Sequence, residues 1–400
     1  MSMGTELNRS HIAVGAAAGL FIVLSAAMVV RHTAPFYANT LSGAGIGLAV
    51  WVMFLALIAV PGAREKAAES RLSECAALCA SAAAVAGLVP VLANWAAGAA
   101  AEPFLISFVS AAPSGLLCGT AALKCWVAWS RRGKSGAVYL SGAAGALLAG
   151  PIFMLVEAIV PFPETANTLR DSGSFAPAAE LIAFLSGPQA AGWLMPFAGI
   201  AAAVTAITFG GGKGCSRPVG LAIFIGGCLQ GALALGYFSI CLEYGFQAYR
   251  MASVIFSAQY AGLALGAWLT GRIKVPALWV MIPLHGAICL VAGAAPAMSV
   301  ILAPEGSPIA AASIFSLGAA AAGILGGLHF GLAARVMKGG LVPDEKAAGL
   351  FGLSAAGAMV AIVAAVLLLF PAFGPVQSIK ALALLSAGAL AALLMALNRR

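Results

Sequence analysis

Long apolar runs recur along almost the whole chain, separated by short polar segments. Each run has about the length that an α-helix needs to cross the hydrocarbon core of a bilayer. The runs predict twelve membrane-spanning helices, at 11–31, 40–61, 73–96, 103–129, 136–160, 178–209, 218–241, 251–270, 276–303, 308–337, 348–372 and 376–398. The sixth run is interrupted by "SGPQ", so a short helix or re-entrant segment before the span proper is an alternative there.

The polar segments are too short to form a soluble domain. The longest runs only from Pro161 to about Pro177, well below the length that can bury a core. We therefore expect a single, all-α membrane domain. Composition supports this expectation, because 62% of the residues are hydrophobic and 8% are charged, with a mean hydropathy of +1.02. Such values exclude both a soluble globular protein and a disordered chain.

Basic residues favour alternate loops. With a cytoplasmic N-terminus, sixteen Lys and Arg residues fall in cytoplasmic segments and four in outer ones, while Lys124 lies inside the fourth span. We therefore expect a multi-pass protein of the inner (plasma) membrane. The positive-inside rule places both of its termini in the cytoplasm. This topology accounts for the net charge of +8, so we expect no nucleic acid partner. The outer segments carry more acidic than basic residues and would mildly attract cations.

Part of the sequence recurs at an offset of 212 positions. Ser114–Ala149 aligns with Gly326–Ala361 without a gap, and eleven of the 36 positions are identical. Both segments have the order helix, basic loop, helix rich in small residues. A second pairing, at an offset of 217, brings Trp51 onto Trp268. The pattern predicts an internal duplication.

The duplication divides the membrane domain into a first repeat at 1–217 and a second at 218–400. Because each repeat has six helices, both would enter the membrane in the same direction, related by an axis along the membrane normal. In lipid, small residues let helix backbones come close and supply much of the packing energy. The candidate packing glycines are Gly115, Gly119, Gly142, Gly145, Gly327, Gly331 and Gly357.

Two families are similar to parts of this sequence. Six plus six parallel helices and the segment "LGAWLTGRIK" resemble the major facilitator superfamily. The segments "CLEYGFQAYRMASVIFSAQYAGLALGAWLTGR" and "KAAGLFGLSAAGAMVAIVAAVLLLFPAFG" more closely resemble the integral-membrane region of spermidine-synthase-like (polyamine aminopropyltransferase-like) proteins, which share that plan. The likeness covers most of the second half and, more faintly, 104–160.

The second resemblance implies a membrane module rather than an enzyme. Membrane-bound aminopropyltransferases of that family carry a soluble Rossmann-like catalytic domain with a Gly-rich loop and an Asp that engages the amine. These 400 residues contain no such domain. We therefore expect the membrane module alone, with no aminopropyltransferase activity and no cofactor.

Four polar residues in or beside the fifth, seventh and eighth spans are candidates for a binding site. Glu157 and Glu243 lie towards the outer ends of their helices, Arg250 directly precedes the next span, and Gln259 lies in that span. Ionisable residues within spans often mark ion or proton pathways, so a substrate or proton site between the halves is one interpretation. The alternative is that these carboxylates reach interfacial water or bond between helices, with Arg250 neutralising Glu243.

Two histidines lie deep in consecutive spans. At 1.5 Å per residue, His285 and His329 are both about 12 to 14 Å from the cytoplasmic ends of their helices. A facing pair relays protons or holds a metal or haem, whereas separated rings are ordinary packing residues. His329 falls on Leu117 in the duplication. The eight cysteines form no CxxC pair and are expected to pack as small apolar residues, without a metal site.

Two functions follow from these patterns. The first is a secondary-transporter-like permease that rocks two halves about a central site and moves a small, cationic solute. The alternative is a non-transporting membrane module that anchors or assists a separate enzyme or redox partner, in the membrane or the periplasm. The scarcity of central polar residues weakens the first, and the lack of a docking domain weakens the second.

Overall fold

Almost all the residues that the structure describes are helical, apart from the short connection at 273–276 and single turn residues at Ala99 and Ser386. The computed structural model describes residues 9–34, 40–57, 72–99, 103–130, 135–159, 216–243, 248–302, 308–338, 344–386, 389–390 and 393–394, and none of them is in a strand. The span expected at 178–209 lies outside these residues. The helices are α1 (Arg9–Thr33), α2 (Thr40–Leu57), α4 (Leu72–Gly98), α5 (Pro103–Ser130), α6 (Ser135–Ile159), α10 (Ser216–Glu243), α11 (Ala248–Leu269), η2 (Thr270–Arg272), α12 (Ala277–Leu302), α13 (Pro308–Lys338), α14 (Asp344–Ala364), η3 (Ala365–Leu369) and α15 (Phe370–Leu385).

Most of these helices suit a bilayer. In hydrocarbon every backbone N–H and C=O must bond within the chain, which a helix achieves over any apolar sequence. Among the described residues, eight helical segments are long and apolar enough to cross a membrane, and shorter apolar helices occur at Gly43–Ala56 and Tyr139–Leu155. The protein is therefore an all-α, multi-pass membrane protein. Each expected span other than 178–209 overlaps a described helix.

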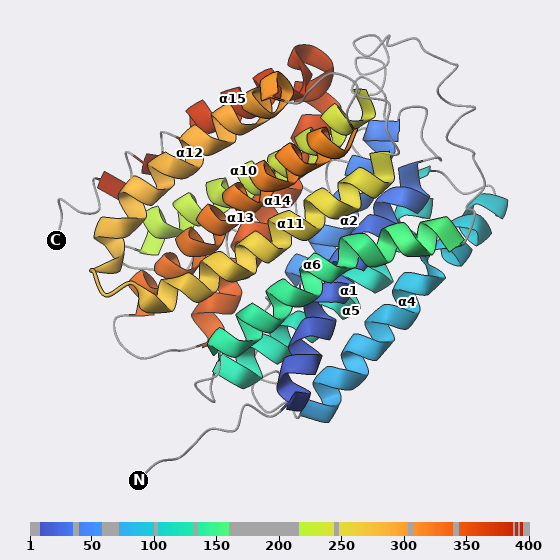
Figure 1. Ribbon diagram of the computed structural model, residues 1–400, viewed down its shortest axis with the longest axis horizontal. Helices are drawn as coiled ribbons and strands as arrows, with labels where there is room; N and C mark the ends of the chain where they lie inside the picture. The colour runs from blue at the N-terminus through green and yellow to red at the C-terminus, as the bar shows by residue number, and fades with distance from the viewer. Residues whose placement is uncertain are drawn as a thin grey trace.

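The last two expected spans share one apolar run. Leu350–Ala383 contains α14, the π-helical segment η3 and α15. Gly374 has a φ of 75°, in the left-handed region that favours glycine, and Pro375 follows it. The chain turns there, so α14 packs against α10 and α2 whereas α15 packs against α12 and α10 (Figure 1).

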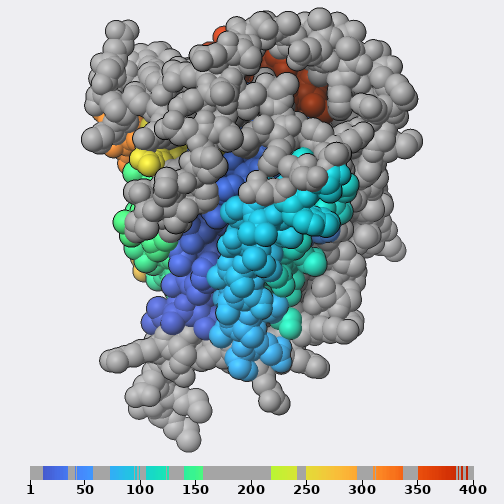
Figure 2. All heavy atoms as spheres, turned by 90° about the vertical axis from the view of Figure 1, so that its right-hand side faces the viewer, coloured from blue at the N-terminus to red at the C-terminus, as the bar shows by residue number. Residues whose placement is uncertain are grey.

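The helices run side by side in alternating directions along one common axis (Figure 1). We call the end at which α1 begins the N-terminal end and the opposite one the far end. α1 packs against α4, α5 and α6, and these four helices share one face of the molecule (Figure 2). In the same way α10 packs against α12, α13 and α14, while α2 packs on α5 and α11 on α13. The two groups meet where α6 packs on α11 and α2 on α14.

Backbones approach closely where α1 meets α6. A Cβ added to Gly19 would overlap the carbonyl of Gly142, and one added to Gly145 would overlap the carbonyl of Ala16. Only glycine allows this approach, because any larger side chain would displace a main chain. We call this contact the first seam.

The contact between α10 and α14 is built alike. A Cβ on Gly227 would overlap the carbonyl of Ser354, and a Cβ on Gly357 would overlap the carbonyl of Phe224. We call this contact the second seam. In both seams the two helices exchange close contacts in both directions.

The other candidate packing glycines also face neighbouring helices. Gly115 on α5 faces the backbone of Trp51 on α2, and Gly327 on α13 faces the backbone of Leu263 on α11. Gly331 faces the side chain of Thr270, and Gly119 is buried. Gly142 takes part through its carbonyl, because a Cβ there would be 3.8 Å from the nearest atom, the carbonyl oxygen of Gly15.

Candidate functional site

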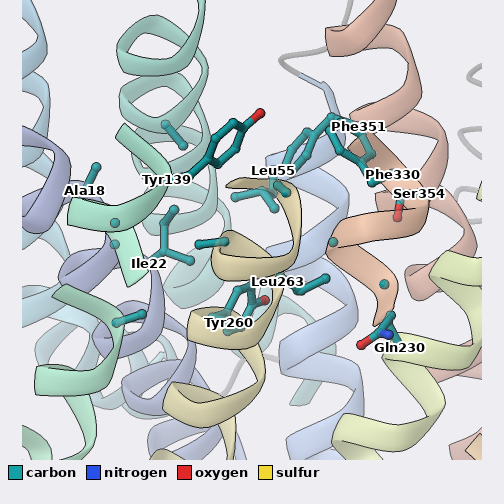
Figure 3. A pocket seen from close by; sticks show the side chains of 18 of the residues that line it. Ala18, Ile22, Leu55, Tyr139, Gln230, Tyr260, Leu263, Phe330, Phe351 and Ser354 are labelled. Carbon is teal, nitrogen blue, oxygen red and sulfur yellow. The ribbon is translucent and has the colours of Figure 1, made fainter. Parts of the chain in front are cut away.

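A mainly apolar cavity of about 280 Å³ lies between the two groups of helices. Ala18, Ile22 and Tyr139 point into it from α1 and α6, and Phe351 and Ser354 point into it from α14 (Figure 3). Leu55 from α2 and Leu263 from α11 lie between them (Figure 3). The volume is near the lower end of the ~300–1,000 Å³ that small-molecule pockets typically have. The cavity therefore has room for a small solute.

A second space of about 120 Å³ adjoins the first. Both are lined by Leu55, Gln230, Tyr260, Leu263, Phe351 and Ser354, and Gln259 borders only the smaller one. The smaller space extends along α10 and α14 to Ala234 and Ile362, farther from the ends at which these helices begin. Together the two spaces reach from the N-terminal end of the bundle towards its middle.

His285 and His329 face each other beside this cavity. Nδ1 of His285 lies 3.3 Å from Nε2 of His329, and the ring centroids are 4.9 Å apart. Both side chains are almost completely buried, at 0% and 2% exposed. The contact joins α12 to α13, and His329 also lines the larger space. Residue counting along the two spans predicted only the depth of these residues, and their contact is a finding of the structure.

The direction of hydrogen bonding through the pair follows from a backbone carbonyl. Nε2 of His285 lies 3.3 Å from the carbonyl oxygen of Ser386, which also accepts from the amides of Ala389 and Leu390. A carbonyl oxygen only accepts, so Nε2 of His285 carries the proton and Nδ1 of the neutral ring is an acceptor. Nε2–H of His329 then donates to that acceptor. The remaining nitrogen of His329, Nδ1, is left with a lone pair.

This nitrogen lies next to α10. A methyl group added to Gly226 would lie 3.4 Å from Nδ1 of His329, and both residues line the cavity. Because Gly226 has no side chain, the space in front of Nδ1 is open. The pair therefore presents a hydrogen-bond acceptor to the cavity.

The geometry of the pair is that of a hydrogen bond. Two rings in direct contact leave no room for a haem between them. Among the described residues, no group of three or more His, Cys, Asp or Glu side chains is placed to hold a metal ion. Of the chemistries considered for this pair, hydrogen bonding and proton exchange fit the observed contact.

A second polar network crosses the smaller space. Nε2 of Gln259 on α11 donates to the side-chain oxygen of Gln230 at 2.8 Å and to its backbone oxygen at 3.0 Å. Nε2 of Gln230 donates to the carbonyl of Ala322 on α13 at 2.8 Å. Each amide nitrogen thus has a backbone carbonyl as partner, which fixes the orientation of both amides. These bonds tie α10, α11 and α13 together.

The network leaves one acceptor over. The residue Gln259 is only 4% exposed. Its side-chain oxygen is buried and has no hydrogen-bond partner among the described residues. A buried amide oxygen without a partner costs roughly 1–3 kcal/mol. Gln259 lines the smaller space, where a ligand is able to satisfy this oxygen.

The other predicted site residues take no described part in the cavity. The side chains of Glu157 and Glu243 lie outside the described residues. Arg250 is half-buried near the start of α11, where its carbonyl accepts a hydrogen bond from Ser253. The described cavity lining contains no Lys, Arg, Asp or Glu side chain. Among the described residues, therefore, no carboxylate lines the cavity to attract a cation.

Charged groups nevertheless pair elsewhere in the bundle. Nζ of Lys124 on α5 lies 3.2 Å from a carboxylate oxygen of Glu74 on α4. The guanidinium of Arg31 lies 4.6 Å from the ring centroid of Tyr249, joining α1 to α11. Both contacts are between helices that pack side by side, and neither reaches the cavity.

Three residues of the site were not predicted from the sequence. Gln230 stands alone as an amide in the apolar run of α10, and that isolation was a usable signal. Ser386 contributes a backbone carbonyl and Gly226 an empty position, and residue type reveals neither role. Sequence reasoning finds polar side chains more readily than it finds backbone acceptors.

Comparison of the sequence with models of protein families finds no matching family, and comparison with curated proteins finds no similar one. The resemblance to spermidine-synthase-like membrane proteins stays a prediction.

Proposed function

We propose that the protein is a secondary-transporter-like permease that moves a small solute by rocking two six-helix halves about the cavity. The observation that carries this proposal is the cavity itself, because it lies between the two groups of helices and is lined by both (Figure 3). A solute bound there contacts both halves at once, so a change in their relative orientation changes its access to either side.

The packing of the helices supports two equivalent halves. The contacts of α1 with α4, α5 and α6 have counterparts in those of α10 with α12, α13 and α14. The cross-contact of α6 with α11 likewise has a counterpart in that of α2 with α14. In the two seams, Gly145 and Gly357 occupy equivalent positions, 212 residues apart as the sequence alignment has them.

The location of the cavity supports an inward-facing state. Ala18 is the tenth residue of α1 and Tyr139 the fifth of α6, so the larger space is near the N-terminal end, which we assign to the cytoplasm of the inner membrane. Towards the far end the halves are in contact. A Cβ added to Gly150 on α6 would lie 2.9 Å from Oγ of Ser257 on α11.

A disulfide between the halves tests this mechanism. In a variant without native cysteines, Gly150→Cys with Ser257→Cys would link α6 to α11 near the far end. We expect oxidation to abolish flux of a transported solute in proteoliposomes, and a reductant to restore it, because the far end must open in each cycle. Candidate solutes are amines, polyamines and amino acids.

A disulfide within one half is the matched control. Thr33→Cys with Gly47→Cys joins α1 to α2, where a Cβ on Gly47 would lie 3.0 Å from Cβ of Thr33. Oxidation of this pair should leave flux unchanged. Equal flux with the α6–α11 disulfide closed and open would overturn the rocking mechanism, and the absence of flux for every solute would favour the non-transporting membrane module.

A further inference from the structure

We propose that the cavity binds a monovalent organic amine with an apolar body, and that the amine donates its N–H groups to Nδ1 of His329 and the side-chain oxygen of Gln259. The inference rests on the proposed function in that it names the solute class of the same cavity. It differs from the sequence-based expectation of a carboxylate site, because it requires no acidic residue.

Each of the two polar networks beside the cavity leaves one acceptor without a partner. Backbone carbonyls of Ser386, Gln230 and Ala322 fix the donors of the two polar networks in place. What each network leaves over is a lone pair, on the imidazole of His329 and on the amide oxygen of Gln259. A ligand that complements both must be a hydrogen-bond donor.

The two acceptors are close enough for one small ligand to reach both. Gly226, which faces His329, and Gln230, which bonds to Gln259, are four residues apart on α10. They lie on the same face of that helix, separated by about 6 Å along its axis. Donors on one small molecule, or successive positions of one ammonium group, therefore reach both acceptors.

The lining of the cavity favours a cation over a neutral donor. An ammonium group has up to three donors and no acceptor, which matches the two leftover acceptors. The hydroxyls of Ser354 and Tyr260, which border both spaces, can also accept. The described lining holds no fixed positive charge, and the aromatic rings of Tyr260 and Phe351 border both spaces. Aromatic faces attract cations, most strongly where water is excluded.

The lining of the cavity limits the ligand to one positive charge. Burying a charge without compensation is costly. The two leftover acceptors and the aromatic faces compensate one ammonium group, and the described lining offers no carboxylate for a second. Most of the remaining lining is glycine, alanine and aliphatic or aromatic side chains, which suits a hydrocarbon or aromatic body. We therefore assign a monoamine and not a polyamine.

The site also predicts the effect of pH. Protonated His329 would donate from Nδ1 and carry a positive charge, so protonation would exclude the ammonium group. The titratable groups near it among the described residues are His285 on α12, Tyr260 on α11, Tyr139 on α6 and Cys125 on α5. α10 and α14 present Gly226, Gln230 and Ser354, which do not titrate. His329 and its partner His285 are thus the pair whose protonation would govern binding as pH falls.

Three probes of one shape separate charge from hydrogen bonding. Equilibrium binding of 2-phenylethylamine to the purified full-length protein is compared with that of its N,N,N-trimethyl derivative, which keeps the charge without an N–H, and of 2-phenylethanol, which keeps a donor without the charge. We expect the amine to bind at least tenfold more tightly than either analogue. Equal binding of the trimethyl derivative or of the alcohol would overturn the proposal.

Substitutions at His329 test the assigned acceptor. His329→Leu should reduce binding of the amine to the level of its trimethyl derivative. His329→Gln keeps a donor for His285 and a carbonyl acceptor, so it should retain most of the binding and show a smaller decrease at acid pH, because only His285 remains to be protonated. Binding of the amine that is unchanged in His329→Leu, or a decrease at acid pH in His329→Gln as large as in the wild-type protein, would overturn the assignment.

Two further variants complete the test. Gln259→Leu should weaken binding of the amine by several-fold, whereas His32→Gln, which removes a histidine of α1 that does not line the cavity, should leave it unchanged. Flux measured with the same probes separates the two proposals. Selective binding without flux would overturn only the transport mechanism, and flux without selectivity for the amine would overturn only the solute class.

Discussion

The two seams pack alike, yet the helices behind them hold different side chains. Behind the first seam, α4 and α5 contribute buried cysteines, Cys75, Cys79 and Cys125, packed with alanines. Behind the second, α12 and α13 contribute the hydrogen-bonded pair His285 and His329. A thiol is a weak donor that behaves as a small apolar group, whereas each imidazole has both a donor and an acceptor.

The difference shows which part of the architecture is free to change. A seam in which one main chain touches another fixes the path of both helices, and only glycine fits there. Side chains one layer behind do not set that path, so polar groups can replace apolar ones. In the sequence alignment, His329 corresponds to Leu117, a partly buried residue packed against a hydrophobic cluster that includes helices of both groups.

Substitution within the seams should have the largest effect. Gly19→Val and Gly227→Val each place a side chain against a backbone carbonyl, so we expect each to destabilise the protein by about 3 kcal/mol or more. Loss of the monodisperse peak in size-exclusion chromatography of the detergent-solubilised protein would reveal this.

Gly87→Val is the matched control, because a Cβ at Gly87 on α4 meets no atom within 4 Å. It should leave the chromatographic profile unchanged. Tolerance of valine at one seam glycine together with intolerance at the other would show that the two seams are not equivalent.

Removing both histidines should cost less than the sum of the costs of removing each one. His329→Leu leaves Nδ1 of His285 without a donor, at roughly 1–3 kcal/mol. Replacing both rings by leucine removes that penalty, so the double variant should be more stable than the two single changes predict. Hydrogen bonds between membrane helices have average coupling energies of about 0.6 kcal/mol and reach about 1.7, and thermal unfolding of the four proteins measures this coupling. Strict additivity would mean that the two rings do not interact.

The charged contact of the first half should matter least. Lys124→Met removes the ion pair with Glu74, whose carboxylate side is about half exposed. Such pairs contribute about 0–1 kcal/mol, so the melting temperature should change by no more than a few degrees. If Lys124→Met lost as much stability as His329→Leu, the ion pair would stabilise the protein as much as the histidine pair does, and this prediction would be wrong.

The helices of this fold were predictable, but the contacts of the site were not. Apolar runs gave the helix positions, because a bilayer enforces both their length and their internal hydrogen bonding. Small-residue motifs likewise gave Gly145 and Gly357, which lie in the two seams. The depth of His285 and His329 followed from counting residues, whereas their contact depends on how α12 and α13 are rotated about their axes. Hydropathy that is uniform around a buried helix carries little information on that rotation.

The tryptophan pairing illustrates the same limit. Trp51 is fully buried and donates its indole N–H to Ser25 at 2.7 Å, whereas the ring of Trp268 lies 4.0 Å from the guanidinium of Arg272. By their contacts with Gly115 and Gly327, Trp51 corresponds to Leu263, which is also 212 positions away. The alignment at an offset of 217 matched residue types only. The packing instead favours the offset of 212 both for Gly115 with Gly327 and for Trp51 with Leu263.

The carbonyl of Ser386 makes the polarity of the histidine pair insensitive to mutation at that position. Every amino acid supplies the same backbone oxygen, so replacing the serine side chain leaves the acceptor for His285 in place. Loss of the proposed acceptor at Nδ1 of His329 would therefore have to arise at His285, at His329 or in the path of the chain that follows α15. In a mutational scan for altered selectivity, position 386 should tolerate substitution while its neighbours across the contact do not.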